Sequence, residues 1–405
     1  MRDINVAVVG IGARGHGNLK TILNIDGVKV KAVCDIYEDR CQDAVDIVKE
    51  KGQPAPYTSL NYKDVITRDD VEAVLIFTNW EVHIKIAIDS MRAGKAVGME
   101  VGGATSLDEC FELVKCYEET KMPIMLLENC CYGKDELLVR NIARDGLFGE
   151  IAHCHGAYGH DLRVEITEGK ENRHYRLDHY TRRNCENYPT HELGPIAKIL
   201  DINRGNRMVK MVSFASKAVG LKSFVEERKD TIVNKDLIGR VFNQGDIINT
   251  LITCANGETI SLKLDTTLPR SYSRELTVRG TKGCYEQNTN TLFFDGDKED
   301  FNTVQYYKDN IDNAAAYEDK YLPEYWKDIT PEQIEMGHGG MDIFVFRAFF
   351  NALAENKPMP IDVYDAASWM CITALSEESI AKGGATLDIP DFTNGEWKTR
   401  PRLDV

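Results

Sequence analysis

Residues 4–15 read Ile-Asn-Val-Ala-Val-Val-Gly-Ile-Gly-Ala-Arg-Gly, and this stretch decides the fold of the first part of the chain. Its β-branched start is typical of a strand, and a helix is expected over 18–24. The glycines between them have the spacing G-x-G-x-x-G, which is typical of a dinucleotide-binding turn. Gly10 allows the tight turn, Gly12 lets a pyrophosphate approach the backbone, and Gly15 lets helix and strand pack closely.

A second predicted strand, 28–34, ends in Asp35, roughly twenty residues after the last glycine of the turn. A carboxylate at this point accepts hydrogen bonds from the ribose hydroxyls of NAD and repels the 2′-phosphate of NADP. The sequence therefore predicts NAD as the cofactor. The alternative for Asp35 is a surface carboxylate after an ordinary strand.

Strands and helices continue to alternate as far as residue 128. Strands are expected at 71–78, 96–100 and 123–128, and helices at 82–93 and 106–120. Successive βα units predict a doubly wound parallel sheet, whose ligand lies beyond the carboxyl ends of the strands. We therefore predict an NAD-binding Rossmann domain over 1–128 and a substrate-binding α/β domain over 129–405.

The residues that follow these strands are the candidates for cofactor binding. They are Asn79, Trp80, His83 and Glu100, together with Arg14 in the glycine turn. For His83 the alternative is a residue that caps the start of the following helix.

The second domain is expected to begin with a helix to about residue 145 and to continue with longer, alternating strands. These strands are predicted at 151–158, 209–218, 246–255, 259–265, 274–279 and 291–294. Strands that follow a βα half predict an open, mostly antiparallel sheet. Helices are expected again at 341–354 and 366–382.

Residues 187–195, Asn-Tyr-Pro-Thr-His-Glu-Leu-Gly-Pro, open a predicted helix. Tyr188 and His191 are three residues apart, so they would share one face of the first turn. A helix N-terminus favours a phenolate and disfavours an imidazolium, so such a pair can handle the proton of a sugar hydroxyl. The alternative is a structural Tyr and His at a domain interface.

Two further segments carry candidate side chains. Tyr158 and His160 alternate at the end of a predicted strand and so share one face, with Arg163 just beyond them. His338, in a glycine loop before a helix, either caps that helix or lines a pocket.

Composition excludes several classes of protein. The formal charge of −15 would repel a phosphate backbone, so no nucleic acid partner is expected. Eleven cysteines without a C-x-x-C pair indicate reduced thiols in a cytoplasmic protein. No signal peptide and no membrane-spanning run is recognised, so no membrane partner is expected. His153 and His155 alternate, but neither a cysteine nor a carboxylate stands at a helpful spacing, so no metal site is predicted.

On these motifs the chain resembles the glucose–fructose oxidoreductase / inositol dehydrogenase family and, more narrowly, the NAD-dependent glycosidases of glycoside hydrolase family 109. The matching stretches span most of the chain. They are 10–15, 78–83, 100–101, 158–163, 188–195, 200–206, 265–269, 272–274, 280–283, 337–342, 362–367 and 390–393.

The chain departs from the wider family at Glu100-Val101-Gly102, where sugar dehydrogenases carry Glu-Lys-Pro. The lysine that helps to deprotonate a substrate hydroxyl is therefore absent, as it is in the glycosidase branch. The loop 163–188 is rich in basic and aromatic residues, among them Arg182. If this loop borders the sugar, its cations suit an acidic or sulfonated sugar, which stays open beside the N-acetylgalactosamine of the family. His160, Arg163, Arg182 and His338 are the predicted substrate-binding residues.

The resemblance implies a redox-neutral glycosidase. NAD⁺ takes a hydride from C3 of the sugar, the resulting ketone acidifies the C2 proton, and a base removes that proton. The C1 leaving group departs, water adds at C1, and C3 is reduced again. By the match, Tyr158 would be the base near C2, and Tyr188 and His191 would hold or deprotonate the C3 hydroxyl.

Two other functions remain open at this point. One is an NAD-dependent sugar dehydrogenase that forms a 3-keto sugar without cleaving a bond, and the other is a non-catalytic NAD-binding regulator. In each case the small-molecule partner is a sugar or glycoside. A homo-oligomer is also expected, because an exposed apolar sheet face needs covering.

Overall fold

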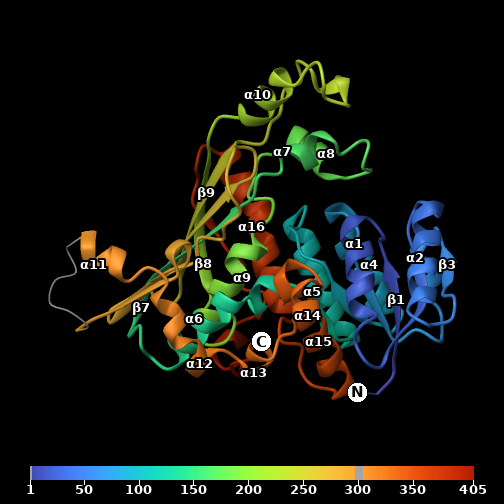
Figure 1. Ribbon diagram of the computed structural model, residues 1–405, viewed down its shortest axis with the longest axis horizontal. Coiled ribbons are helices and arrows are strands. Elements are labelled where there is room, and N and C mark those ends of the chain that lie inside the picture. The colour runs from blue at the N-terminus through green and yellow to red at the C-terminus, as the bar shows by residue number, and fades with distance from the viewer. Residues whose placement is uncertain (1, 297–303) are drawn as a thin grey trace. The chain divides into compact units, whose positions relative to one another are not determined.

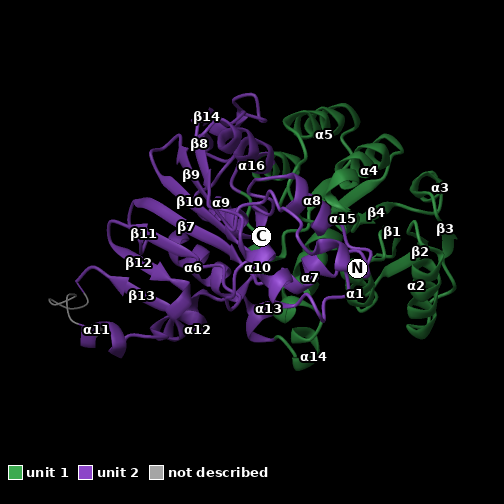
Figure 2. Cartoon of the chain, turned by 90° about the horizontal axis from the view of Figure 1, so that it is seen from above, with its two compact units in different colours: residues 1–132, 329–370, 403–405 green, residues 133–328, 371–402 purple. Residues whose placement is uncertain are grey.

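The structure is a computed structural model that describes residues 2–296 and 304–405. The chain divides into two compact units, coloured separately in Figure 2. Unit 1 comprises Met1–Tyr132, Ile329–Met370 and Leu403–Val405, and unit 2 comprises Gly133–Asp328 and Cys371–Arg402.

Six parallel strands form the sheet of unit 1 in the order β3-β2-β1-β4-β5-β6. They are β1 (Ile4–Val9), β2 (Val28–Cys34), β3 (Tyr57–Ser59), β4 (Ala73–Ile76), β5 (Ala96–Met99) and β6 (Ile124–Leu126). Strands β1 and β3 of this sheet are labelled in Figure 1. The central strands β1 and β4 are rich in Val and Ile and almost wholly buried, as strands covered on both faces are. This strand order is that of a doubly wound dinucleotide-binding sheet, so the predicted Rossmann fold is confirmed.

The helices between these strands pack in pairs, α1 beside α2 and α4 beside α5. Their bounds are α1 (Ala13–Ile22), α2 (Glu38–Glu50), α3 (Tyr62–Ile66), α4 (Trp80–Arg92) and α5 (Leu107–Thr120). The helix expected over 18–24 already begins at Ala13, inside the glycine turn, which brings its N-terminus close to the end of β1.

The C-terminal helices α14 (Pro331–Ile334), α15 (Met341–Ala354) and the first part of α16 (Val363–Ala381) also belong to unit 1. Phe346 of α15 packs edge-on against Phe77, with 6.1 Å between the ring centroids. The Thr21 hydroxyl of α1 donates to the carbonyl of Met336 at 3.0 Å. These contacts join residues far apart in sequence to the Rossmann sheet. The domain bounds 1–128 and 129–405 remain a prediction.

Unit 2 is built on an eight-stranded sheet in the order β13-β12-β11-β7-β10-β9-β8-β14. Its strands are β7 (Ile151–Gly159), β8 (Met208–Ala215), β9 (Ile247–Cys254), β10 (Thr259–Asp265), β11 (Thr277–Gly280), β12 (Gly283–Glu286), β13 (Thr291–Phe294) and β14 (Leu387–Asp388). The pair β7–β10 is parallel and the other pairs are antiparallel, so the predicted mostly antiparallel sheet is confirmed.

One face of this sheet carries exposed apolar side chains. Phe214 of β8 and Leu251 of β9 are 57 % and 55 % exposed. The buried residues of β9 alternate with exposed ones, which is the pattern of a strand with one covered face. The expected homo-oligomer, which rests on such a face, stays a prediction.

Helix α9 (Thr190–Ile199) packs against β7, and it is buried along its whole length. The other helices of unit 2 are α6 (Lys134–Arg144), α7 (Arg163–Thr167), α8 (Arg176–Arg182), α10 (Gly220–Glu227), α11 (Val304–Asp309), α12 (Glu318–Tyr321) and α13 (Glu324–Lys327). Among the described helices of the whole chain, none has both the length and the apolar composition that crossing a bilayer requires.

Candidate active site

The glycine turn after β1 has the shape that close approach of a phosphate needs. Gly10 has φ +92°, and a Cβ on Gly15 would lie 1.9 Å from the carbonyl oxygen of Gly10, so both positions require glycine. At Gly12 the nearest atom to an added Cβ is Nη1 of Arg40, 3.5 Å away. The backbone is therefore open at the middle glycine and closed at the other two, which fits a pyrophosphate above Gly12.

Asp35 lies directly after β2 and is 7 % exposed. Its Oδ2 accepts a hydrogen bond from the backbone N–H of Ile11 at 2.7 Å, and its Oδ1 accepts one from the N–H of Tyr37 at 3.1 Å. Nη1 of Arg40 lies 3.7 Å from Oδ2. The carboxylate thus fixes the glycine turn, and its predicted bond to a ribose stays a prediction.

Buried polar atoms without partners stand at the end of β4. The Oγ1 atom of Thr78 and the Oδ1 atom of Asn79 have no hydrogen-bond partner among the described residues. Asn79 precedes α4 without capping it through its side chain. Buried polar atoms are normally hydrogen-bonded, so these atoms fit a ligand that supplies the missing partners.

The position of Trp80 explains why residue 102 is a glycine here and not the proline of the wider family. Gly102 has φ +147°, and a Cβ there would lie 2.3 Å from Cδ1 of the Trp80 indole. The backbone after β5 therefore approaches the indole closely, and glycine is the residue that this approach allows.

His83 is fully buried within α4. Burial lowers its pKa from 6.5 to about 4, and neither ring nitrogen has a hydrogen-bond partner among the described residues. The side chain therefore does not cap α4. Its predicted contact with the cofactor remains untested.

Arg14 and Glu100 meet at the carboxyl ends of β1 and β5. Nε of Arg14 donates to Oε2 of Glu100 at 2.8 Å, and Asn18 donates to the same oxygen at 3.1 Å. His338, predicted to bind substrate, also lies in unit 1, where its Nδ1 is 3.0 Å from Nη1 of Arg14. These residues are part of the unit that holds the glycine turn, and the substrate role of His338 stays a prediction.

In unit 2, three predicted catalytic side chains form one aromatic cluster: Tyr158, Tyr188 and His191. The centroids of the Tyr158 and Tyr188 rings are 4.6 Å apart, and the His191 ring lies 4.7 Å from Tyr188 and 5.5 Å from Tyr158. The expected shared helical turn is wrong, because α9 begins at Thr190 and Tyr188 precedes it. The rings of Tyr188 and His191 nevertheless meet edge to face.

His160 and Arg176 contact this aromatic cluster. Nδ1 of His160 lies 3.1 Å from the Tyr158 hydroxyl, in line with the strand alternation that the sequence predicts. The guanidinium of Arg176 lies 5.0 Å from the centre of the Tyr188 ring. Burial raises the pKa of Tyr158 well above its ordinary value, and the positive charge of Arg176 acts against that rise. The sequence did not single out Arg176 from the other basic residues of its loop.

The two arginines predicted to bind substrate each pair with a carboxylate. Arg163 forms two hydrogen bonds with Asp161, at 2.8 and 2.6 Å. Arg182 forms an ion pair with Asp178 on an exposed side of α8. Their predicted contact with a sugar is untested.

Two buried carboxyl groups neighbour the cluster residues in the sequence, Glu186 before Tyr188 and Glu192 after His191. Glu186 is fully buried and Glu192 is 2 % exposed. Burial raises the pKa of both, and the charge of Glu186 raises that of Glu192 further. Two negative charges on neighbouring buried carboxyl groups repel each other, so at least one of the pair is protonated at neutral pH.

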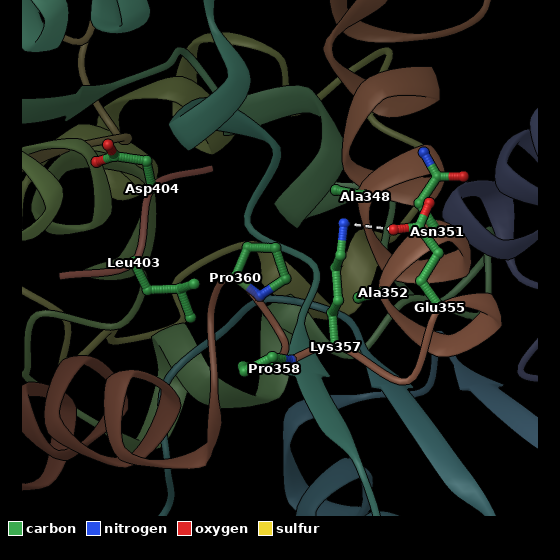
Figure 3. A pocket seen from close by; sticks show the side chains of 9 residues that line it. All are labelled: Ala348, Asn351, Ala352, Glu355, Lys357, Pro358, Pro360, Leu403 and Asp404. Atoms are coloured by element: carbon green, nitrogen blue, oxygen red, sulfur yellow. Dashed lines mark ion pairs between the residues drawn. The ribbon is translucent and has the colours of Figure 1, made fainter. Parts of the chain in front are cut away.

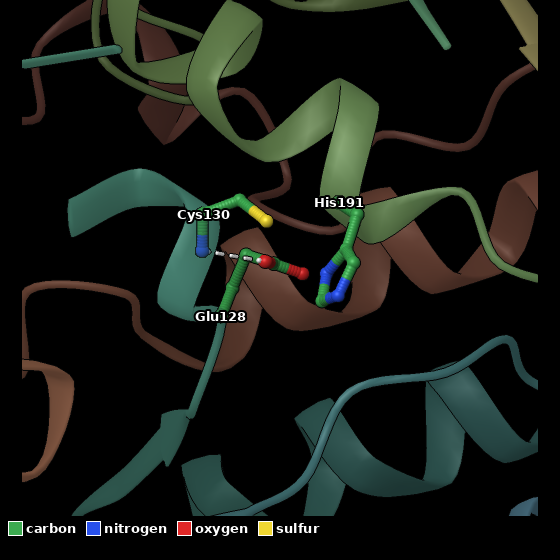
Figure 4. A group of neighbouring side chains, drawn as sticks. All are labelled: Glu128, Cys130 and His191. Carbon is green, nitrogen blue, oxygen red and sulfur yellow. Dashed lines mark hydrogen bonds between the residues drawn. The ribbon is translucent and has the colours of Figure 1, made fainter. Parts of the chain in front are cut away.

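Figure 4 draws three side chains of types that bind metal ions: Glu128, Cys130 and His191. In unit 1, Oε1 of Glu128 accepts a hydrogen bond from the backbone N–H of Cys130 at 3.0 Å (Figure 4). His191, labelled in the same figure, belongs to the first turn of α9 in unit 2. The absence of a metal site stays a prediction.

A cavity of about 340 Å³ in unit 1 involves none of the predicted site residues (Figure 3). It is lined by residues of α15, by the segment that follows α15 and by two residues near the C-terminus, Leu403 and Asp404. Lys357 and Glu355 form an ion pair of 2.5 Å at its edge.

Comparison with known proteins adds to this geometry. Residues 132–399 match the family model described as glycosyl hydrolase 109, C-terminal domain, and residues 4–127 match the oxidoreductase family, NAD-binding Rossmann fold. A glycosyl hydrolase family 109 protein of Stenotrophomonas maltophilia is 38 % identical, over 98 % of this chain and 91 % of that protein. An alpha-N-acetylgalactosaminidase of Tannerella forsythia is 35 % identical, over 96 % of this chain and 86 % of that protein.

Solved structures share the fold at low identity. Levoglucosan dehydrogenase in complex with NADH and levoglucosan has a TM-score of 0.71 and 18 % identity, covering 96 % of this chain and 100 % of that one. The myo-inositol 2-dehydrogenase of Lactobacillus plantarum has a TM-score of 0.65 and 18 % identity, with the same coverage.

The match of residues 4–127 to the NAD-binding Rossmann family and the glycine turn identify the cofactor as NAD. The protein is an NAD-dependent enzyme that acts on sugars. With a family model matching 132–399 and relatives aligned over nearly the whole chain, it belongs to the glycosyl hydrolase 109 family.

Proposed function

We propose that the protein hydrolyses glycosides through transient oxidation of the sugar at C3. When bound, NAD⁺ supplies the redox chemistry, because it accepts a hydride from C3 and returns it at the end of the cycle. The ketone at C3 makes the C2–H bond acidic. A base then takes the C2 proton, the C1–C2 double bond forms, and the C1–O bond to the leaving group breaks. Water adds at C1 and a proton returns to C2, so no external oxidant is consumed.

The single observation that carries this proposal is the contact of the Tyr158 ring with Tyr188 and His191. Three side chains that can exchange protons are thereby gathered at the end of one strand and the start of one helix. Tyr158 would take the C2 proton, and Tyr188 and His191 would hold the C3 hydroxyl and accept its proton.

The proposed base needs help to ionise, because burial favours its neutral form. Arg176 supplies a positive charge beside the rings, which favours the phenolate of Tyr158. His160, 3.1 Å from the Tyr158 hydroxyl, offers a partner for the phenolic proton. We infer that these two residues prepare Tyr158 for proton transfer.

Val101 supports cleavage of the glycoside rather than net dehydrogenation. It is 3 % exposed and stands where sugar dehydrogenases of the wider family carry a lysine. An isopropyl side chain cannot accept a proton. Deprotonation of the sugar hydroxyl therefore falls to the aromatic cluster in unit 2.

We infer that the substrate is a neutral glycoside. Arg163 and Arg182 are each compensated by a carboxylate, Asp161 and Asp178, which reduces their attraction for an acidic sugar. The relative from Tannerella forsythia is named an alpha-N-acetylgalactosaminidase, so α-N-acetylgalactosaminides are the first compounds to test.

The test is incubation with aryl glycosides that release a coloured phenol on cleavage. The panel contains both anomers of N-acetylgalactosaminide, a neutral glucoside and a uronide. We expect phenol release from at least one neutral glycoside, with no build-up of absorbance from NADH. Steady NADH formation from free sugars, with no phenol from any compound, would establish a dehydrogenase instead.

A further inference from the structure

Asp342, at the start of α15, is the centre of a buried polar cluster in unit 1. Its carboxylate is 1 % exposed and receives hydrogen bonds from three residues. Arg14 donates to it from Nη1 at 2.5 Å and from Nη2 at 3.1 Å, and Asn129 donates from Nδ2 at 2.7 Å. His338 contributes a contact from Nδ1 at 2.9 Å. We call these residues, with Glu100, the Asp342 cluster.

The Asp342 cluster fixes Arg14, which lies between the second and third glycines of the turn. Arg14 lies in the first turn of α1, and its guanidinium is placed between two carboxylates, Glu100 at 2.8 Å and Asp342. Paired bonds to planar carboxylates restrict both the position and the tilt of an arginine. The N-terminus of α1, and with it the open backbone at Gly12, is therefore tied to α15.

Asn129 extends the same restraint to the end of β6. The chain leaves this strand at residue 126, and Asn129 is fully buried. Because its amide donates to the same oxygen of Asp342 that Nη2 of Arg14 approaches, one carboxylate restrains two of the strand ends in this sheet.

The loop before α15 is shaped around this carboxylate. All four residues of 337–340 have positive φ, including His338 at +44°. A Cβ added to Gly337 would lie 2.3 Å from Oδ2 of Asp342. A backbone held in this way persists only where surrounding contacts determine it. Here the contacts are those of Asp342.

Charge strengthens the arrangement. Burial by itself raises the pKa of Asp342, but the charge of Arg14 and the hydrogen bond from His338 outweigh this and hold the pKa well below its usual range. The carboxylate is therefore ionised throughout the physiological range. Hydrogen bonds to charged groups are about twice as strong as neutral ones, and burial removes competition from water.

We propose that Asp342 is a positioning residue for NAD, which holds Arg14 and Asn129 so that the glycine turn keeps its phosphate-binding shape. The expected effect of Asp342 is that both NAD⁺ and NADH dissociate slowly. The inference rests on NAD binding and holds whether or not a glycosidic bond is cleaved.

The test compares Asp342→Asn with the unchanged enzyme by removing free cofactor through dialysis and measuring bound NAD(H). We expect at least tenfold weaker binding of NAD⁺ and of NADH, read from titration by intrinsic fluorescence. Asp246→Asn is the matched control, because Asp246 is also buried and accepts bonds from Gly220 and Thr267, but lies in unit 2. An Asp342→Asn enzyme that retains NAD(H) as well as the control would overturn the proposal.

A double-variant cycle separates positioning from general loss of stability. If Asp342 acts through Arg14, Asp342→Asn should weaken NAD binding much less in an Arg14→Gln background. Full additivity of the two effects would contradict that route.

If Asp342→Asn does not fold, Gly337→Ala provides the test in the loop, where the added methyl group displaces the carboxylate without changing its charge. We expect weaker NAD binding with an unchanged circular dichroism spectrum. Unaltered NAD affinity in Gly337→Ala would refute the proposal.

Discussion

The ring of Tyr158 lies 4.6 Å from the ring of Tyr188, with 34° between the two planes. Tyr158 comes from the end of β7 and Tyr188 from the residues just before α9. The contact between α9 and β7 therefore decides whether the two phenols meet. Tyr158 is held by the strand itself and Tyr188 lies two residues before the helix, so both rings are close to regular elements that restrict their positions, as proton transfer requires.

The first prediction concerns this aromatic cluster. We expect Tyr188→Phe and His191→Ala each to reduce turnover by about a hundred- to ten-thousand-fold, because positioned proton transfer contributes roughly that much. Turnover on the best glycoside of the panel is the measurement. Tyr285→Phe is the control, since Tyr285 is a fully buried tyrosine elsewhere in unit 2, on β12. Near-normal turnover in both cluster variants would mean that the pair is structural.

The second prediction concerns cofactor choice. Asp35→Ala should weaken NAD binding, because a ribose partner and a restraint on the glycine turn are lost together. It should weaken NADP binding less or improve it, since Arg40, now 3.7 Å from the carboxylate, can then pair with a 2′-phosphate. Titration with both cofactors measures the ratio of affinities. Equal losses for the two would count against a role of Asp35 in ribose recognition.

The third prediction uses the buried carboxyl pair. Burial raises the folded-state pKa of Glu186 above its unfolded value of about 4.5, so the folded protein holds a proton that the unfolded chain releases. Stability from this group is complete below pH 4.5 and is lost as the pH rises toward the folded pKa.

Glu186→Gln should therefore raise the melting temperature, and the gain should grow between pH 6 and pH 8. Each unit of pKa shift corresponds to about 1.4 kcal/mol. Glu192→Gln should act in the same direction, because it removes the neighbouring charge. A gain that is the same at every pH would show that Glu186 does not titrate in this range.

The fourth prediction uses His83. Its folded pKa, about 4, is below the unfolded value of 6.5, so the unfolded chain binds the extra proton between these values. Stability is then complete above pH 6.5 and decreases as the pH falls to 4, by about 3 kcal/mol at most. His83→Leu should reduce this slope in urea unfolding, whereas His16→Gln, on the partly exposed side of α1, should keep it. An unchanged slope in His83→Leu would show that this histidine is not the source.

Much of the fold follows from local pattern. The run of Val and Ile in β1, the glycine turn and the alternation of β9 each reflect contacts that neighbouring residues determine. Helix α2 and strand β12 were not predicted. The buried residues Cys41, Ala44, Val45 and Val48 do have helical spacing, so the pattern of α2 is present in the sequence. Strand β12 is four residues long and next to a turn, so it depends on pairing partners that the local sequence does not reveal.

In the candidate site, too, some contacts follow from local sequence pattern and others do not. The alternation of Tyr158 and His160 was sufficient to place them together. The bond from Arg14 to Asp342 joins residues 328 positions apart, and no local pattern indicates it. Arg176 likewise stands among several basic residues of one loop, and only the fold shows that its guanidinium lies over Tyr188.

Turnover of a glycoside in heavy water tests the central claim most directly. If Tyr158 removes the C2 proton and solvent supplies the proton that returns, the product sugar should carry deuterium at C2, and NADH should not accumulate. Nuclear magnetic resonance of the product and absorbance at the NADH band are read in the same reaction. Stoichiometric NADH with an intact glycosidic bond, across both anomers and neutral and acidic sugars, would contradict the account.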